Sequence, residues 1–95
     1  MKILVDRVAV PVRGSPVEIG NVYANQHHKN FRVVLNVMNR GKYDRPYNNV
    51  VCICINAMGE IVGAKVEPEA YIRDHQDLVG KVEKMPEMKI EWIKP

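Results

Sequence analysis

The sequence predicts a small all-β protein with one short helix, folded as a single domain over residues 1–95. The longest apolar run, residues 50–55, is followed after a glycine-containing break by a second β-rich run, residues 61–66. This pattern predicts two antiparallel strands joined by a tight turn. Breaks with Gly and Pro recur roughly every ten residues, as in small barrels and sandwiches. With 46% hydrophobic and 26% charged residues, the composition is that of a globular chain rather than a disordered one.

The N-terminal part of the chain is expected to form a hairpin. Residues 2–12 alternate imperfectly between apolar and polar side chains, which predicts a strand with a bulge or bend near Asp6. Pro11 cannot donate a hydrogen bond to a neighbouring strand and therefore favours a sheet edge. Residues 13–16 have the composition of a turn, and residues 17–19 resume the period of two, so we expect them to close the hairpin. The polar residues 24–30 are predicted to be a loop.

The middle of the chain has the strongest strand signals. Residues 31–38 alternate most regularly, and residues 50–55 are apolar on both faces, as expected of a central strand covered from two sides. Between them, residues 39–49 contain Gly41 and Pro46 without an apolar period, which predicts a long connection of about eleven residues. The predicted core takes one face of each periodic strand and consists of Phe31, Val33, Leu35, Val51, Ile53, Ile55 and Ile90.

The last third of the chain is predicted to contain a short helix and two strands. Pro68 and the acidic residues on either side of it suit the first turn of a helix, so we expect one or two helical turns over residues 68–75. Residues 78–83 are predicted to be a short strand. Met85 and Pro86 then break the chain, and residues 88–93 alternate again, which predicts a closing strand.

Several stretches together resemble the small SH3-like barrel modules of bacterial and phage proteins of unknown function. They are Ile19-Gly20-x-Val22-Tyr23 and residues 31–34, 50–52 and 78–83. The resemblance covers residues 17–83 and implies a barrel with a helical turn before its closing strand. The strands predicted at 2–12 and after Met85 depart from that pattern. An OB-like barrel, with three meander strands over residues 31–67 and a helix at 68–75, is therefore the alternative. Neither fold implies a reaction.

Few residues suit catalysis or metal binding: the single serine, Ser15, and the histidines His27, His28 and His75. The serine lies in a Gly-Ser-Pro turn, two histidines are adjacent in a polar stretch, and the third ends the predicted helix, where its charge favours the helix dipole. Cys52 and Cys54 lack the paired spacing of a zinc site, so we expect buried, reduced thiols. The sequence therefore predicts no enzyme, no metal site and no cofactor.

Positive charge is concentrated in the first half of the chain. Residues 1–49 carry eight Lys/Arg against three Asp/Glu, a net +5, whereas residues 50–95 carry six against eight, a net −2. Such asymmetry favours an anionic partner. Some of the cations adjoin tyrosines, which suits nucleic acid because the charges hold phosphates and the rings stack on bases. The predicted ligand-binding residues are Lys29, Arg32, Arg40, Lys42, Tyr43, Arg45 and Tyr47.

Two functions from different classes fit these features. The first is a non-enzymatic binding module, of the kind found in bacterial or phage accessory proteins, that contacts nucleic acid or a nucleotide through residues 39–49. The second is a protein-interaction or inhibitor module that pairs an exposed edge strand with a partner or with its own copy, as a homo-oligomer. The N-terminus has charges inside its apolar run, unlike a signal peptide, and no run is long enough to span a bilayer. A soluble, cytoplasmic protein is therefore expected.

Overall fold

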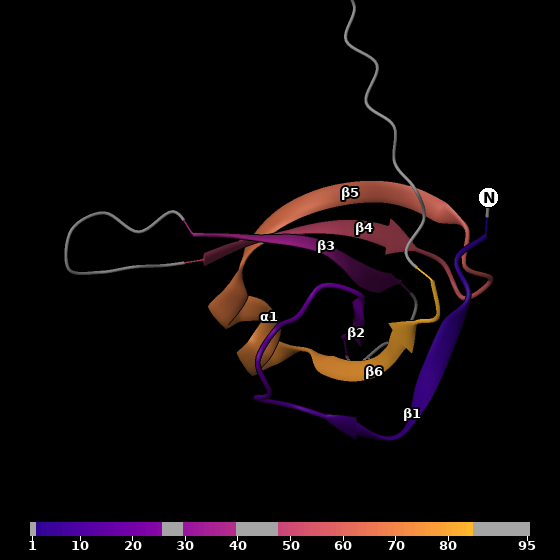
Figure 1. Cartoon of the computed structure of the whole chain (residues 1–95), viewed down its shortest axis with the longest axis horizontal. Coiled ribbons are helices and arrows are strands. Elements are labelled where there is room, and N and C mark those ends of the chain that lie inside the picture. Colours follow the sequence, from indigo (N-terminus) through magenta and orange to yellow (C-terminus); the bar gives the residue numbers. More distant parts are fainter. Residues whose placement is uncertain (1, 26–29, 40–47, 85–95) are drawn as a thin grey trace, which may run out of the picture.

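The computed structural model describes residues 2–25, 30–39 and 48–84, which form one curved antiparallel sheet of six strands and a short helix (Figure 1). In chain order the elements are β1 (Val5–Val12), β2 (Asn21–Ala24), β3 (Phe31–Asn39), β4 (Asn48–Ile55), β5 (Ile61–Pro68), α1 (Glu69–His75) and β6 (Asp77–Val82). The strand order across the sheet is β1-β6-β2-β3-β4-β5. The predicted class, mostly antiparallel β-sheet with one short helix, is confirmed.

The strands β3, β4 and β5 form the predicted meander, and the turn between β4 and β5 is held by Asn56. Its side-chain oxygen accepts hydrogen bonds from the backbone N–H groups of Met58 and Glu60, both at 3.0 Å. Gly59 in this turn has φ 82°, a left-handed conformation that favours glycine. The glycine-containing break in the sequence therefore marks a tight hairpin, as predicted.

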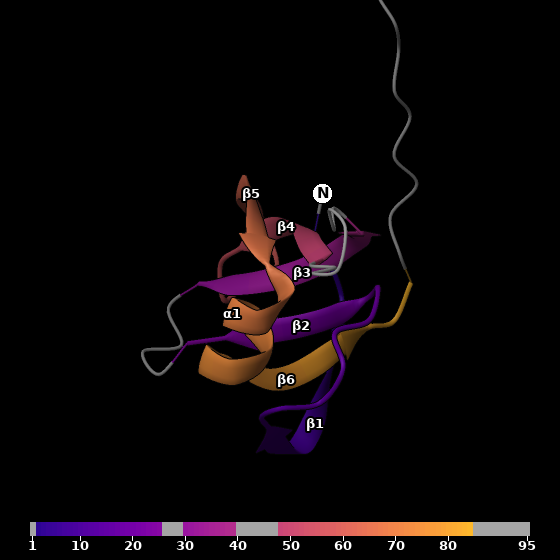
Figure 2. The ribbon, with the colours of Figure 1, turned by 90° about the vertical axis from the view of Figure 1, so that its left-hand side faces the viewer.

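Both faces of β4 are buried, as its two-sided apolar pattern predicts. One face of the sheet holds the cluster Ile3, Val22, Ala24, Phe31, Val33, Ile53 and Ile55. The other face holds the cluster Val17, Tyr23, Val34, Val50, Cys52, Ile72 and Leu78. Ile72 comes from α1, which lies across this second face (Figure 2). We call these clusters the inner and the helix-side cluster.

The predicted core is confirmed for its central members, Phe31, Val33, Ile53 and Ile55, which are all buried in the inner cluster. Two others, Leu35 and Val51, are only half-buried. The register shifts between Val34 and Asn36, so Leu35 is the extra residue of a β-bulge. None of the helix-side cluster was among the predicted core residues, because alternation alone does not show that a helix covers the second face. Ile90 lies outside the described residues, as does the strand predicted at 88–93.

The hairpin predicted at the N-terminus is wrong. β1 pairs with β6, from the far end of the chain, and residues 17–19 form no strand. A four-residue strand that the sequence analysis missed, β2, lies instead between β6 and β3, and all of its residues are buried. Four residues buried on both faces show no alternation of apolar and polar side chains, so periodicity could not reveal this strand.

The two edges of the curved sheet, β1 and β5, are not paired with each other. They approach only where Lys2 forms a single antiparallel bridge with Glu60 and the N–H of Ile3 donates to the Gly59 carbonyl oxygen at 2.9 Å. The sheet is therefore not closed among the described residues, and an SH3-like or OB-like barrel is not confirmed. The connection between β3 and β4 is also shorter than predicted, residues 40–47, because the ladder continues to the pair Asn39 and Asn48.

Candidate interaction surface

The outer edge of β5 is the most exposed long strand edge in the described part of the chain. Along one edge, β5 pairs with β4 in a regular register from Gly63 to Pro68. Its other side has no strand partner among residues 2–25, 30–39 and 48–84. Seven of its eight residues are exposed, and Glu67 is half-buried. A strand edge of this kind offers backbone N–H and C=O groups to a further strand.

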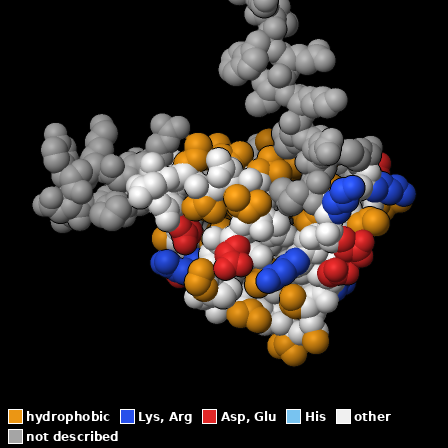
Figure 3. Space-filling view, in the orientation of Figure 1, with side chains coloured by type: hydrophobic (Ala, Val, Ile, Leu, Met, Phe, Trp, Pro, Cys, Tyr) orange, Lys and Arg blue, Asp and Glu red, His pale blue; other side chains and the backbone are white. Residues whose placement is uncertain are grey.

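One face of β5 is apolar along its whole length. Ile61 and Ala64 pair with Ile55 and Ile53 of the inner cluster, so they share its face of the sheet. Val66, which pairs with Val51, lies on the same face by alternation. Val62 falls on the same face by alternation. Yet Val62 and Val66 are 57% and 59% exposed. Hydrophobic side chains gather over β5 along the upper rim in Figure 3. The inner face of the sheet is thus exposed to solvent along β5.

The opposite edge of the sheet, β1, is built differently. Its register with β6 is irregular between Arg7 and Val12. Pro11 lies in the unpaired part, where it can donate no hydrogen bond, and Asp6 and Arg7 carry charge on the strand. Irregular pairing, proline and charge are the devices by which proteins protect an edge from further pairing. β5 has a register shift only near its start, between its pairs with Cys54 and Ile55, and it carries one exposed charge, Lys65. Its edge from Gly63 to Pro68 is therefore more regular than that of β1 and better suited to accept a strand.

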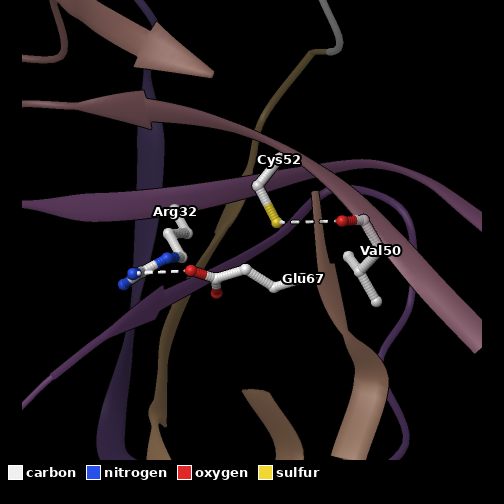
Figure 4. Close-up of polar contacts among 4 residues, drawn as sticks. All are labelled: Arg32, Val50, Cys52 and Glu67. Carbon is white, nitrogen blue, oxygen red and sulfur yellow. Dashed lines mark hydrogen bonds and ion pairs between the residues drawn. The ribbon is translucent and has the colours of Figure 1, made fainter. Parts of the chain in front are cut away.

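On the helix side of the sheet, an ion pair joins β3 to β5 across β4. The Nη2 of Arg32 lies 2.9 Å from Oε1 of Glu67, and both side chains are largely buried, at 13% and 15% exposed. Figure 4 shows this pair beside Cys52, whose Sγ lies 4.0 Å from the Val50 carbonyl oxygen. Burial, together with the nearby Glu67 carboxylate, raises the pKa of the Cys52 thiol to about 12. This cluster fixes β5 to the sheet and leaves Cys52 a poor nucleophile.

Of the seven predicted ligand-binding residues, only Arg32 lies in the described part of the chain. Its guanidinium is engaged with Glu67 rather than presented to solvent as a free cation. Lys29, Arg40, Lys42, Tyr43, Arg45 and Tyr47 lie outside the described residues. The nucleic-acid hypothesis for residues 39–49 therefore stays a prediction.

The cysteines and His75 lie in structural positions. Both Cys52 and Cys54 are free thiols, as predicted, with Cys52 buried and Cys54 half-buried. His75 ends α1, as predicted, and its ring centroid lies 5.4 Å from that of Tyr71. Ser15 has a buried Oγ without a hydrogen-bond partner among the described residues. His27 and His28 lie outside these residues.

A cavity of about 170 Å³ opens between the N-terminal residues and the β4–β5 turn. Its floor is apolar, formed by Val22, Phe31 and Ile55 of the inner cluster. Leu4 and Met58, both about two-thirds exposed, also line it. Arg7 is the charged residue of its lining. A cavity of this size and lining accommodates an apolar group about as large as a benzene ring.

The sequence predicts an exposed edge strand but does not indicate which strand lies at the edge. A usable signal was present: residues 61–66 carry apolar side chains at 61, 62, 64 and 66 and one charged side chain, Lys65, and Glu67 and Pro68 follow them. Only the strand order shows that this run lies at an edge. Its composition would suit a buried strand equally well.

Comparisons with known proteins return no similarity: no family model matches the chain, and neither a curated protein nor a solved structure resembles it. Among the described residues, no helix is long and apolar enough to cross a membrane. Any function assigned to the chain therefore has to come from its own residues.

Proposed function

We propose that this chain is a non-enzymatic protein-interaction module whose β5 edge accepts an extended strand from a partner protein. The observation that carries the proposal is the combination at β5 of an edge without a strand partner in the described chain and an exposed apolar face. In strand addition, backbone hydrogen bonds supply affinity, and side chains on alternate positions of the added strand supply specificity.

The chemistry of the partner follows from the two faces of β5. On the inner face, an added strand would lie beside Val62, Ala64 and Val66, so apolar side chains at every second position fit there. On the helix side it would lie beside Gly63 and the exposed Lys65, so an acidic side chain fits the intervening positions. The preferred partner is therefore an extended segment in which apolar and acidic or polar residues alternate.

The test is to select peptides from a random display library against the full chain. The selected peptides should bind with little dependence on salt, because edge pairing relies on backbone hydrogen bonds and apolar contacts. Val66→Lys should weaken their binding about tenfold or more, or about 1.4 kcal/mol. Val10→Lys is the matched control, because Val10 is an exposed valine on the opposite edge strand, 71% exposed. Peptides that bind the Val66→Lys variant as tightly as the wild type would contradict the proposal.

The rival hypothesis, nucleic-acid binding through residues 39–49, predicts a different response to salt. Neutralising three phosphates of a single strand would give log affinity a slope of roughly −2 against log salt. Replacing Arg40, Lys42 and Arg45 by Ala should flatten that slope. If the chain binds single-stranded nucleic acid with this salt dependence, and Val66→Lys does not weaken the binding of the selected peptides, nucleic-acid binding through residues 39–49 is the correct function.

The finer expectations from the sequence accompany this proposal as hypotheses. An SH3-like or OB-like barrel would require the sheet to close between its two edge strands, β1 and β5. A cytoplasmic accessory protein of bacterial or phage type is compatible with a strand-accepting edge. A homo-oligomer would result if β5 paired with β5 of a second copy, and dilution would then dissociate it.

A further inference from the structure

The cavity between the N-terminal residues and the β4–β5 turn takes no part in the proposed function of β5. Its floor is made of buried side chains of the inner cluster, Val22, Phe31 and Ile55. Leu4 and Met58 also line it, and both are exposed although their side chains are large and apolar. A ligand that fills the cavity would remove these side chains from water, which is favourable.

The walls of the cavity are held in place by backbone contacts. The N–H of Ile3 donates to the Gly59 carbonyl oxygen at 2.9 Å, and Lys2 bridges to Glu60. A Cβ at Gly59 would lie 2.5 Å from the Ile3 carbonyl oxygen, so the two segments pack as closely as glycine allows. The cavity is therefore formed before a ligand binds, and binding does not have to order its walls.

The backbone groups around the cavity are already used, which favours a small molecule over a peptide. The Leu4 carbonyl oxygen accepts from the N–H of Glu83. The N–H and the carbonyl oxygen of both Asn56 and Gly59 take part in hydrogen bonds of the turn and its contact with Ile3. An added polypeptide strand needs free N–H and C=O groups. An occupant of the cavity is therefore held by side chains.

Arg7 supplies positive charge to the cavity. It lies two residues after Val5 on β1, so it falls on the face of β1 that packs against the inner cluster. Its partner on β6 is Gly80, which has no side chain to cover it. Among residues 2–25, 30–39 and 48–84 the ion pairs join other arginines, so Arg7 has no carboxylate partner there. Its guanidinium is free to bind an anion.

The neighbouring acids are engaged elsewhere. Asp6 lies on the opposite face of β1 by alternation, and its side chain hydrogen-bonds with that of Glu83. Glu60 accepts a hydrogen bond from Nδ2 of Asn56 at 3.4 Å and is not among the described residues that line the cavity. The charge that faces the cavity is therefore that of Arg7, which favours an anionic ligand.

We infer that the cavity binds a small carboxylic acid, whose apolar group fills the cavity and whose carboxylate pairs with Arg7. A volume of about 170 Å³ limits the apolar group to about six to eight carbons, the size of a benzene ring with a short linker. A guanidinium binds a carboxylate through two parallel hydrogen bonds. One arginine neutralises a monoanion, whereas a phosphate monoester carries nearly two charges. The site is separate from the β5 edge, so the inference goes beyond the proposed function.

Phenylacetate is the test ligand, and it is titrated into the nitrogen-15-labelled full chain and followed by NMR. It should shift the amide signals of Leu4, Val5 and Gly59 saturably, with a dissociation constant of the order of a millimolar for its roughly ten non-hydrogen atoms. The matched neutral ligand, 2-phenylethanol, should bind there about two- to fivefold more weakly, because Arg7 is exposed and its ion pair contributes modestly. Phenethylamine, of opposite charge, should bind more weakly still.

Substitutions separate the charge from the apolar cavity. Arg7→Gln should lower the affinity for phenylacetate to that for 2-phenylethanol and leave the affinity for the alcohol unchanged. Ala57→Trp, which adds bulk to the lining, should abolish binding of both ligands, whereas Ala70→Trp, at an exposed alanine of α1, should not. Circular dichroism verifies that the variants are folded. Leu4→Ala, which removes part of one wall without adding bulk, should weaken both ligands about threefold or more.

Three results would overturn the inference. The first is a lack of saturable shifts around the cavity at concentrations well above the expected dissociation constant. The second is equal affinity of the wild type for phenylacetate and 2-phenylethanol, which removes the pairing with Arg7. The third is shifts confined to residues 62–66 and lost in Val66→Lys, which place the ligand on the apolar face of β5 instead. Val66→Lys should leave binding at the cavity unchanged, so failure of this inference is distinguishable from failure of the proposed function.

Discussion

Substituting Gly80 by Ala tests the pairing of β1 with β6 at its closest point. A Cβ at Gly80 would lie 2.7 Å from the backbone oxygen of Asp6 and 2.6 Å from a methyl carbon of Val5. Ordinary contacts begin at 3.4 Å, so the backbone of β1 would have to move by about 0.7 Å. Overpacking of this kind costs about 1 to 3 kcal/mol. For a chain of this size, that lowers the melting temperature by roughly 4 to 20 °C.

Gly63→Ala is the matched control, because Gly63 also lies within a strand but a Cβ there meets nothing within 4 Å. This variant should be neutral, or more stable by about 0.4 to 1 kcal/mol because the unfolded chain loses freedom. Urea unfolding followed by circular dichroism compares the two. The Gly80→Ala midpoint should fall by about 0.5 to 2 M at an unchanged slope. Equal midpoints for the two variants would refute the close packing of β1 on β6.

Three further outcomes follow from burial and charge. Ile53→Ala, in the inner cluster, should cost about 2 to 5 kcal/mol, and an unchanged denaturation midpoint would contradict its central position. The Cys52 thiol, with a pKa of about 12, should react with a thiol reagent at neutral pH only after unfolding, so fast labelling in the native state would contradict its burial. A hydrogen bond to Asp6 and the charge of Asp6 raise the pKa of Glu83 above its usual 4.5 in the folded state. Protonated Glu83 therefore stabilises the folded chain below pH 4.5, and this stabilisation is lost as the pH rises through the raised pKa. Asp6→Asn should therefore reduce the fall in the urea midpoint between acidic and neutral pH, and a fall equal to that of wild type would exclude this coupling.

The sequence by itself determined the elements whose physical cause is local. The alternation in residues 31–38, the two-sided apolar run in residues 50–55 and the glycine in the β4–β5 turn each specify a backbone conformation within a few neighbouring residues. The helix after Pro68 is of the same kind, since proline and the acidic Glu69 act on its first turn. These features predicted the meander and the short helix before any contact between distant residues was known.

Only the tertiary structure decided how these elements are joined into a sheet. β1 pairs with β6, about seventy residues away, and β2 lies buried between β6 and β3. Such pairings depend on which surfaces meet when the chain collapses, and alternation within one strand carries no information about its neighbours. The same limit applies to function. Residues 61–66 have the composition of a buried strand. Val62 and Val66 become part of a candidate interaction surface only because the strand order places β5 at the edge of the sheet.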